Sequence, residues 1–124
     1  MIWLLIGLGG ALGAMARHGL NHVVHRGALS STFPTGIFLV NVSGSILIGV
    51  IAGAVVSGRW HLGLEARTFL IVGVLGGFTT FSSFSLDTLT LVRTGHEVQA
   101  AINVLGQVGL SLFGVWLGFR LTGG

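Results

Sequence analysis

One stretch decides how this chain folds: residues 73–88, with the sequence GVLGGFTTFSSFSLDT. It lies inside a long apolar region, yet it holds adjacent glycines at 76 and 77, adjacent threonines at 79 and 80, and several serines. Glycine and β-branched threonine are poor residues for a helix interior, so a helix that enters this stretch is predicted to break there. In a bilayer, the backbone groups freed by a break are tolerated only where they meet protein, an ion or a water-filled cavity. The stretch therefore predicts a broken membrane helix with polar partners at its break.

The composition places the chain in a membrane. Of its 124 residues, 52% are hydrophobic and 7% are charged, and the mean hydropathy is +0.93. A soluble domain carries about 25% charged residues, so this chain lacks the residues to cover itself with a hydrated surface. The length allows about four spanning helices of roughly 20 residues each. We therefore expect an all-α membrane protein, with one integral membrane domain over residues 1–124.

Several classes of protein are disfavoured by residue usage. The chain has no cysteine, which excludes disulfides, thiol catalysis and thiolate metal sites. Its basic side chains are six scattered arginines and no lysine, so they form no patch of the kind that binds nucleic acid. The first apolar run lacks the preceding basic region of a signal peptide, and its glycines lack the following acidic residue of a dinucleotide-binding loop. We expect no enzyme.

Four apolar segments are predicted to be the spanning helices: residues 2–24, 35–56, 68–92 and 98–119. The third contains the break. Glycine pairs four residues apart occur in the other three, and such pairs let membrane helices approach closely. These pairs are Gly9 with Gly13, Gly49 with Gly53, and Gly114 with Gly118.

Polar residues inside these segments are candidate functional residues, because a polar side chain at membrane depth is costly unless paired or wet. Asn41 in the second segment serves either as a hydrogen-bonding link between helices or as a pore-lining residue. The fourth segment carries a polar residue every four positions, which predicts a polar interface or a water-filled track. That stripe consists of Gln99, Asn103, Gln107 and Ser111.

Three histidines near the end of the first segment have helical spacing: His18, His22 and His25. Such spacing occurs in metal sites, but no carboxylate lies nearby in the sequence to support one. We favour an interfacial face at the helix end.

Three motifs in this chain resemble those of the Fluc family, the small bacterial CrcB-like fluoride channels. They are GGFTTFSSFS at 76–85, GGALGAMAR at 9–17 and PTGIFLVNVSG at 34–44. The resemblance implies a multi-pass protein of the bacterial inner membrane that exports fluoride passively, as an antiparallel homodimer of dual topology. Two departures concern the family's usual threonine and glutamate, which are Ile37 and Asp87 here.

The resemblance also implies which residues meet ions. Phe81 and Phe84 match the family's pore phenylalanines, although i and i+3 phenylalanines alone indicate ordinary packing. Their positive ring edges would face the anion. The other expected members of the fluoride pathway are Asn41, Ser82, Ser83, Ser111 and Arg17. The backbone carbonyls of Gly76 and Thr79 match ligands of a structural sodium ion at the dimer centre.

The distribution of arginine independently favours dual topology. The amino terminus, second connection and carboxyl terminus carry three arginines, and the other two connections carry three, so the positive-inside rule gives no preferred orientation. The main alternative is a proton-coupled small multidrug exporter, which needs a membrane carboxylate, and Asp87 is the candidate. A non-transporting assembly protein would explain the glycines, but not the polar stripe or the break.

Overall fold

The computed structural model of this chain describes residues 1–27 and 32–124, and in these ranges the regular structure is helical, with no strand. The all-α prediction is confirmed. The elements are α1 (Ile2–Arg26), α2 (Thr35–Val56), α3 (Leu64–Arg67), η1 (Thr68–Leu75), α4 (Gly76–Phe78), α5 (Phe81–Arg93) and α6 (Glu97–Gly123). The third predicted segment, 68–92, is thus divided among η1, α4 and α5, and α3 precedes it. η1 is a π-helix of eight residues.

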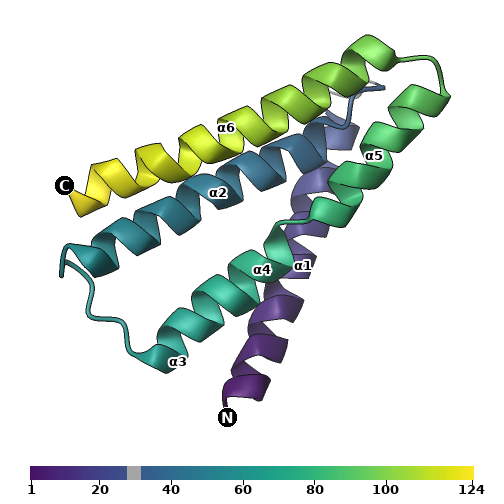
Figure 1. Cartoon of the computed structure of the whole chain (residues 1–124). Coiled ribbons are helices and arrows are strands. Elements are labelled where there is room, and N and C mark those ends of the chain that lie inside the picture. Colours follow the sequence, from purple (N-terminus) through teal and green to yellow (C-terminus); the bar gives the residue numbers. More distant parts are fainter. Residues whose placement is uncertain (28–31) are drawn as a thin grey trace.

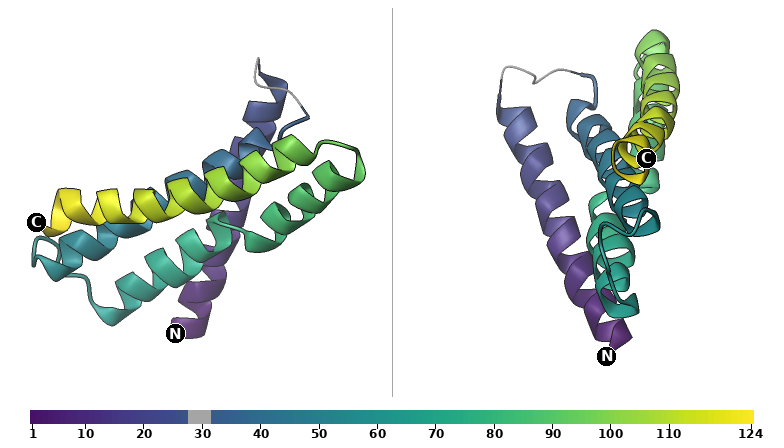
Figure 2. Two further views of the ribbon diagram at one scale, coloured as in Figure 1. Left: turned by 45° about the horizontal axis from the view of Figure 1, so that its top comes forward. Right: turned by 90° about the vertical axis from the view of Figure 1, so that its left-hand side faces the viewer.

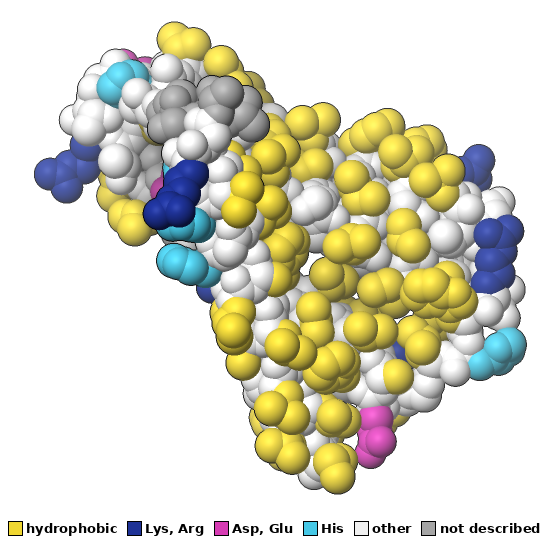
Figure 3. All heavy atoms as spheres, turned by 180° about the vertical axis from the view of Figure 1, so that it is seen from behind, with side chains coloured by type: hydrophobic (Ala, Val, Ile, Leu, Met, Phe, Trp, Pro, Cys, Tyr) yellow, Lys and Arg dark blue, Asp and Glu magenta, His cyan; other side chains and the backbone are white. Residues whose placement is uncertain are grey.

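Within the described ranges, three helical segments are long and apolar enough to cross a membrane: Thr35–Val56, Leu64–Arg93 and Glu97–Gly123. α1 is not among them. Its first half is apolar, but its second half carries Arg17, Asn21 and three histidines. Hydrophobic side chains cover much of the face shown in Figure 3, and arginine and histidine lie mostly toward two opposite sides of that view.

The helices form two closely packed pairs. α2 and α6 lie side by side along their length, and α1 packs against η1 and α4 (Figure 1). Figure 2 shows that α1 crosses the α2–α6 pair steeply, while α5 returns toward the start of α6.

Glycine makes both of these helix pairs possible. A Cβ atom on Gly9 would lie 2.7 Å from the Phe69 carbonyl oxygen, and one on Gly13 would lie 2.7 Å from the Phe78 backbone nitrogen. In the other pair, a Cβ on Gly53 would lie 2.6 Å from the Phe119 carbonyl oxygen. The predicted close approach at these glycines is confirmed, because no side chain fits between the backbones.

The predicted break is present, but it lies beyond the two glycines. Gly76 and Gly77 are helical, whereas Thr79 (φ −81°, ψ 155°) and Thr80 (φ −152°, ψ 115°) are extended. Low helix propensity at the glycines therefore does not place the break. Partners that only the folded chain provides hold the two threonines in their extended conformation, as described next.

Candidate functional site

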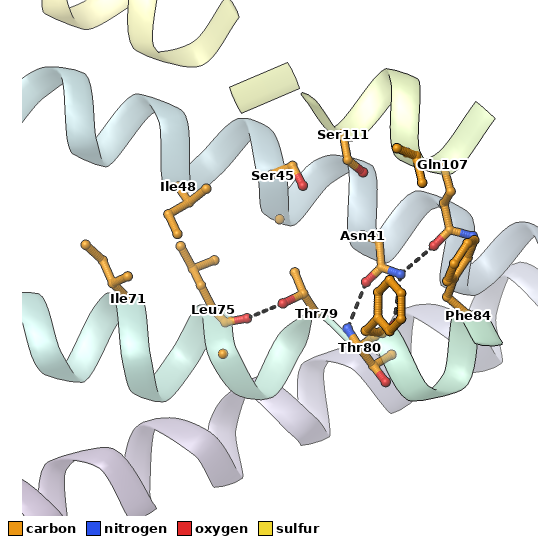
Figure 4. Close-up of a pocket in the computed structure, with 14 residues that line it drawn as sticks. Asn41, Ser45, Ile48, Ile71, Leu75, Thr79, Thr80, Phe84, Gln107 and Ser111 are labelled. Atoms are coloured by element: carbon orange, nitrogen blue, oxygen red, sulfur yellow. Dashed lines mark hydrogen bonds between the residues drawn. The ribbon is translucent and has the colours of Figure 1, made fainter. Parts of the chain in front are cut away.

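A cavity of about 350 Å³ lies between α2, the broken third helix and α6 (Figure 4). Its lining is polar around the break and apolar toward Ile48 and Ile71. It brings together most of the predicted site residues. These are Asn41, Gly76, Thr79, Phe81, Phe84 and Ser111.

The side chain of Asn41 makes two hydrogen bonds to the backbone at the break. Its Oδ1 accepts a hydrogen bond from the Thr80 backbone N–H at 2.8 Å, and its Nδ2 donates to the Thr80 carbonyl at 3.1 Å. The side-chain oxygen thus replaces the helical acceptor that the Thr80 N–H has lost, which is what a break inside a membrane requires. The second Nδ2 hydrogen is donated to Gln107 Oε1 (Figure 4). Both donors of the Asn41 amide are therefore used within the chain.

The Thr80 side chain begins the helix that follows the break. Its Oγ1 accepts from the Ser83 backbone N–H at 3.1 Å, as an N-cap does. The same hydroxyl donates to Ser83 Oγ and lies 3.2 Å from Ser82 Oγ. Ser82 and Ser83 therefore gather around Thr80 at the N-terminus of α5, and they do not line the cavity.

The two phenylalanines form a tilted pair, with ring centroids 5.3 Å apart and planes at 51°. Phe84 is 8% exposed and packs inside the chain, whereas Phe81 is 77% exposed. One chain thus encloses one ring of the pair and leaves the other on its surface. Ser111, on α6, lines the same cavity.

The backbone at the break presents two carbonyl oxygens. The Gly76 carbonyl accepts no hydrogen bond from the described residues, since its helical donor, the Thr80 N–H, is bound to Asn41. The Thr79 carbonyl accepts from Arg17 Nη1 at 3.4 Å. Arg17 therefore approaches the break from α1, outside the cavity.

Sequence reasoning missed two residues at this site. Helix propensity marks Thr80 only as a poor helix former. The signal for its capping role is that threonine is a preferred N-cap residue and Thr80 directly precedes Phe81, where α5 begins. Gln107 was recognised only as part of the polar stripe, and it is the partner of Asn41. Asp87 does not line the cavity, and Ile37 is buried at 8% exposure.

The fold and the site define a small multi-pass membrane protein with an interrupted helix at a cavity that is polar on one side and apolar on the other. A model of the family described as CrcB-like protein, Camphor Resistance (CrcB), matches residues 4–119. The chain belongs to this CrcB-like family.

Its relatives include three proteins named fluoride-specific ion channel FluC. The one from Rhodospirillum rubrum is 46% identical over 95% of this chain and 92% of its own length. The one from Opitutus terrae is 49% identical over 94% of this chain and 89% of its own length. The one from Thermus thermophilus is 47% identical over 98% of this chain and 94% of its own length.

Proposed function

We propose that this protein is a fluoride channel of the bacterial inner membrane, and that it lets cytoplasmic fluoride leave passively. The observation that carries the proposal is the cavity at the break, which is lined by the Phe81–Phe84 pair and by polar side chains in a chain 46–49% identical to three named fluoride channels. Hydrofluoric acid is a weak acid that enters cells in neutral form and dissociates inside. The membrane potential then drives the anion out at about 2.3 kcal/mol per charge per 100 mV, so no coupled ion is needed.

The chemistry of the site suits a small, strongly hydrated anion. A pore must replace the water around the ion with donors at each step. The edges of Phe81 and Phe84 carry the positive part of the ring quadrupole, and Ser111 contributes a hydroxyl. The N-terminus of α5 directs its first backbone N–H groups toward the break, where the helix dipole favours negative charge. Ser82 and Ser83 supply hydroxyls on the same turn, and Arg17 adds a positive charge that attracts anions.

A second copy of the chain completes the proposed channel. In one chain Phe81 is exposed, and Gly76 has a carbonyl without a donor among the described residues. Two copies in opposite orientations would be related by a two-fold axis in the membrane plane. Each copy would then face the break of its partner, which allows four spanning helices per chain to surround a shared path.

The carbonyls of Gly76 and Thr79 fit a structural sodium ion at that axis. Unwound backbone carbonyls and helix C-terminal ends coordinate sodium in membrane proteins. Gly76 offers a free oxygen, and the Thr79 carbonyl has a second lone pair beside its bond to Arg17. Bound there, the ion would supply positive charge where the two breaks meet.

Separate measurements of fluoride and chloride efflux test this function. Purified protein is reconstituted in liposomes, with a potassium ionophore to carry the compensating charge. We expect rapid fluoride efflux without a proton gradient, while chloride is retained. Efflux that requires a proton gradient and fails in Asp87→Asn would contradict the channel and favour the multidrug exporter.

Dual topology is tested with reporters at the carboxyl terminus. The even division of six arginines predicts signal from both a cytoplasmic and a periplasmic reporter. Two arginines added beside Arg59 should shift most of the signal to one side, since the starting bias is near zero. Signal from one side alone in the unmodified chain would rule out the antiparallel dimer.

A further inference from the structure

A ladder of side-chain hydrogen bonds leads away from Asn41 along α6. Asn41 Nδ2 donates to Gln107 Oε1, and Gln107 Nε2 donates to Asn103 Oδ1 at 2.9 Å. Asn103 Nδ2 donates to Thr88 Oγ1 at 3.0 Å. The Thr88 hydroxyl ends the ladder by donating to the Phe84 carbonyl at 2.8 Å. We call this series of bonds the amide ladder.

The two amides in the middle of the ladder are buried. Asn103 is 0% exposed and Gln107 is 3% exposed. A buried amide without partners costs about 1–3 kcal/mol, so these two side chains have little freedom to leave the ladder. Their neighbour in the polar stripe differs, because Gln99 Oε1 has no hydrogen-bond partner in the part of the chain that is described.

The ladder has one permitted direction. A hydroxyl has a single hydrogen, and Thr88 uses it on the Phe84 carbonyl, so it can only accept from Asn103. The nitrogen of Asn103 must therefore face Thr88 and its oxygen must face Gln107. Because the Asn103 oxygen can only accept, the nitrogen of Gln107 must face Asn103, and the oxygen of Gln107 must then face Asn41. At the other end, the Thr80 N–H independently requires the Asn41 oxygen on its own side. Both ends of the ladder thus impose one orientation on Asn41.

We propose that Gln107 and Asn103 are positioning residues of the ion pathway, which fix the Asn41 amide and so hold the break open. The inference rests on the proposed channel function. The ladder ties the backbone of Thr80 to that of Phe84 through α2 and α6. It therefore fixes the position of the Phe84 ring relative to the break. The amides of Gln107 and Asn103 need not touch the ion to do so.

The test is the unit fluoride current of single channels in planar bilayers. A loss of folded protein lowers the number of channels, whereas a displaced pathway changes the current through each one. Gln107→Met keeps the length of the side chain and removes both ladder bonds. We expect its unit current to fall by about fivefold or more, the factor that corresponds to losing a buried hydrogen bond. The matched control is Gln99→Met on the same helix, with an expected unit current equal to that of the unmodified chain.

A second variant tests the direction of the ladder in one folded sample. The carboxylate of Gln107→Glu accepts from Asn41 but cannot donate to Asn103, whereas its protonated form does both. We expect a low unit current at pH 8 that recovers as the pH falls, and no recovery in Gln107→Met. Neutral hydrofluoric acid carries no current and does not contribute. Two ionisable groups flank the ladder, Asp87 before Thr88 and Arg17 at Thr79. The series is therefore repeated with Asp87→Asn, and the recovery should persist.

The outcomes separate the inference from the function on which it rests. If the unmodified chain carries no fluoride current, the proposed channel is wrong. If it conducts and Gln107→Met has the same unit current, the positioning role is wrong. If Gln107→Met does not assemble, the pH series decides, and a current in Gln107→Glu that stays constant with pH overturns the inference.

Discussion

Valine at position 13 should remove most of the folded protein from the membrane. A Cβ atom on Gly13 would lie 2.7 Å from the Phe78 backbone nitrogen and 3.0 Å from the Gly77 carbonyl carbon, so it meets backbone that cannot rotate away. α1 would have to separate from α4 next to the break. Overpacking at a buried site costs about 1–3 kcal/mol where side chains can adjust, and we expect about 3 kcal/mol or more here.

The measurement is thermal stability in detergent, followed by recovery of the folded protein on size exclusion. Gly7→Val is the matched control, because it makes the same change in the same helix where a Cβ meets nothing within 4 Å. We expect its stability to lie within about 0.5 kcal/mol of the unmodified chain. Equal loss in both variants would mean that valine harms α1 itself and that the glycine contact does not matter.

Isoleucine at position 84 should reduce the unit fluoride current by about tenfold or more while the protein still assembles. Isoleucine keeps most of the bulk and the apolarity but has no ring edge, so the change removes the quadrupole. Phe84 is largely enclosed and pairs with Phe81 at 5.3 Å, and we expect Phe81→Ile to reduce the current in the same direction. A tenfold change corresponds to about 1.4 kcal/mol at the barrier, which is within the range of aromatic interactions.

Phe113→Ile serves as the control for this prediction. Phe113 also belongs to an aromatic pair, with Trp116 at 5.6 Å, but it lies on α6 away from the cavity. Its unit current should match that of the unmodified chain. Normal currents in both Phe81→Ile and Phe84→Ile would remove the aromatic edges from the ion path.

Much of the fold could be predicted because its determinants are local in sequence. The lengths of the apolar segments predicted the helices. The spacing of the glycines predicted the helix faces on which Gly9, Gly13 and Gly53 contact other backbones. α1 was the exception to a simple reading of hydropathy, since its polar second half lowers the average.

The site was less predictable because its decisive contacts join residues far apart in the chain. The break lies at Thr79 and Thr80, where Asn41 supplies partners from another helix, and helix propensity contains no information about that contact. Similarly, the stripe on α6 indicated a polar interface, but its spacing could not show that Gln107 is the residue that meets Asn41. The roles of Phe81, Ser82, Ser83, Ser111 and Arg17 toward an anion stay predictions.

The contact between Asn41 and Thr80 also bears on how the protein is made. Asn41 precedes the break by 39 positions, so α2 leaves the ribosome before the broken helix does. A helix with an exposed N–H and carbonyl is costly in lipid until those groups find partners. The order of synthesis therefore makes the Asn41 side-chain amide available before the Thr80 backbone needs it as a partner. A circular permutant in which the broken helix is made first should depend on membrane chaperones and proteolytic surveillance more than the natural order does.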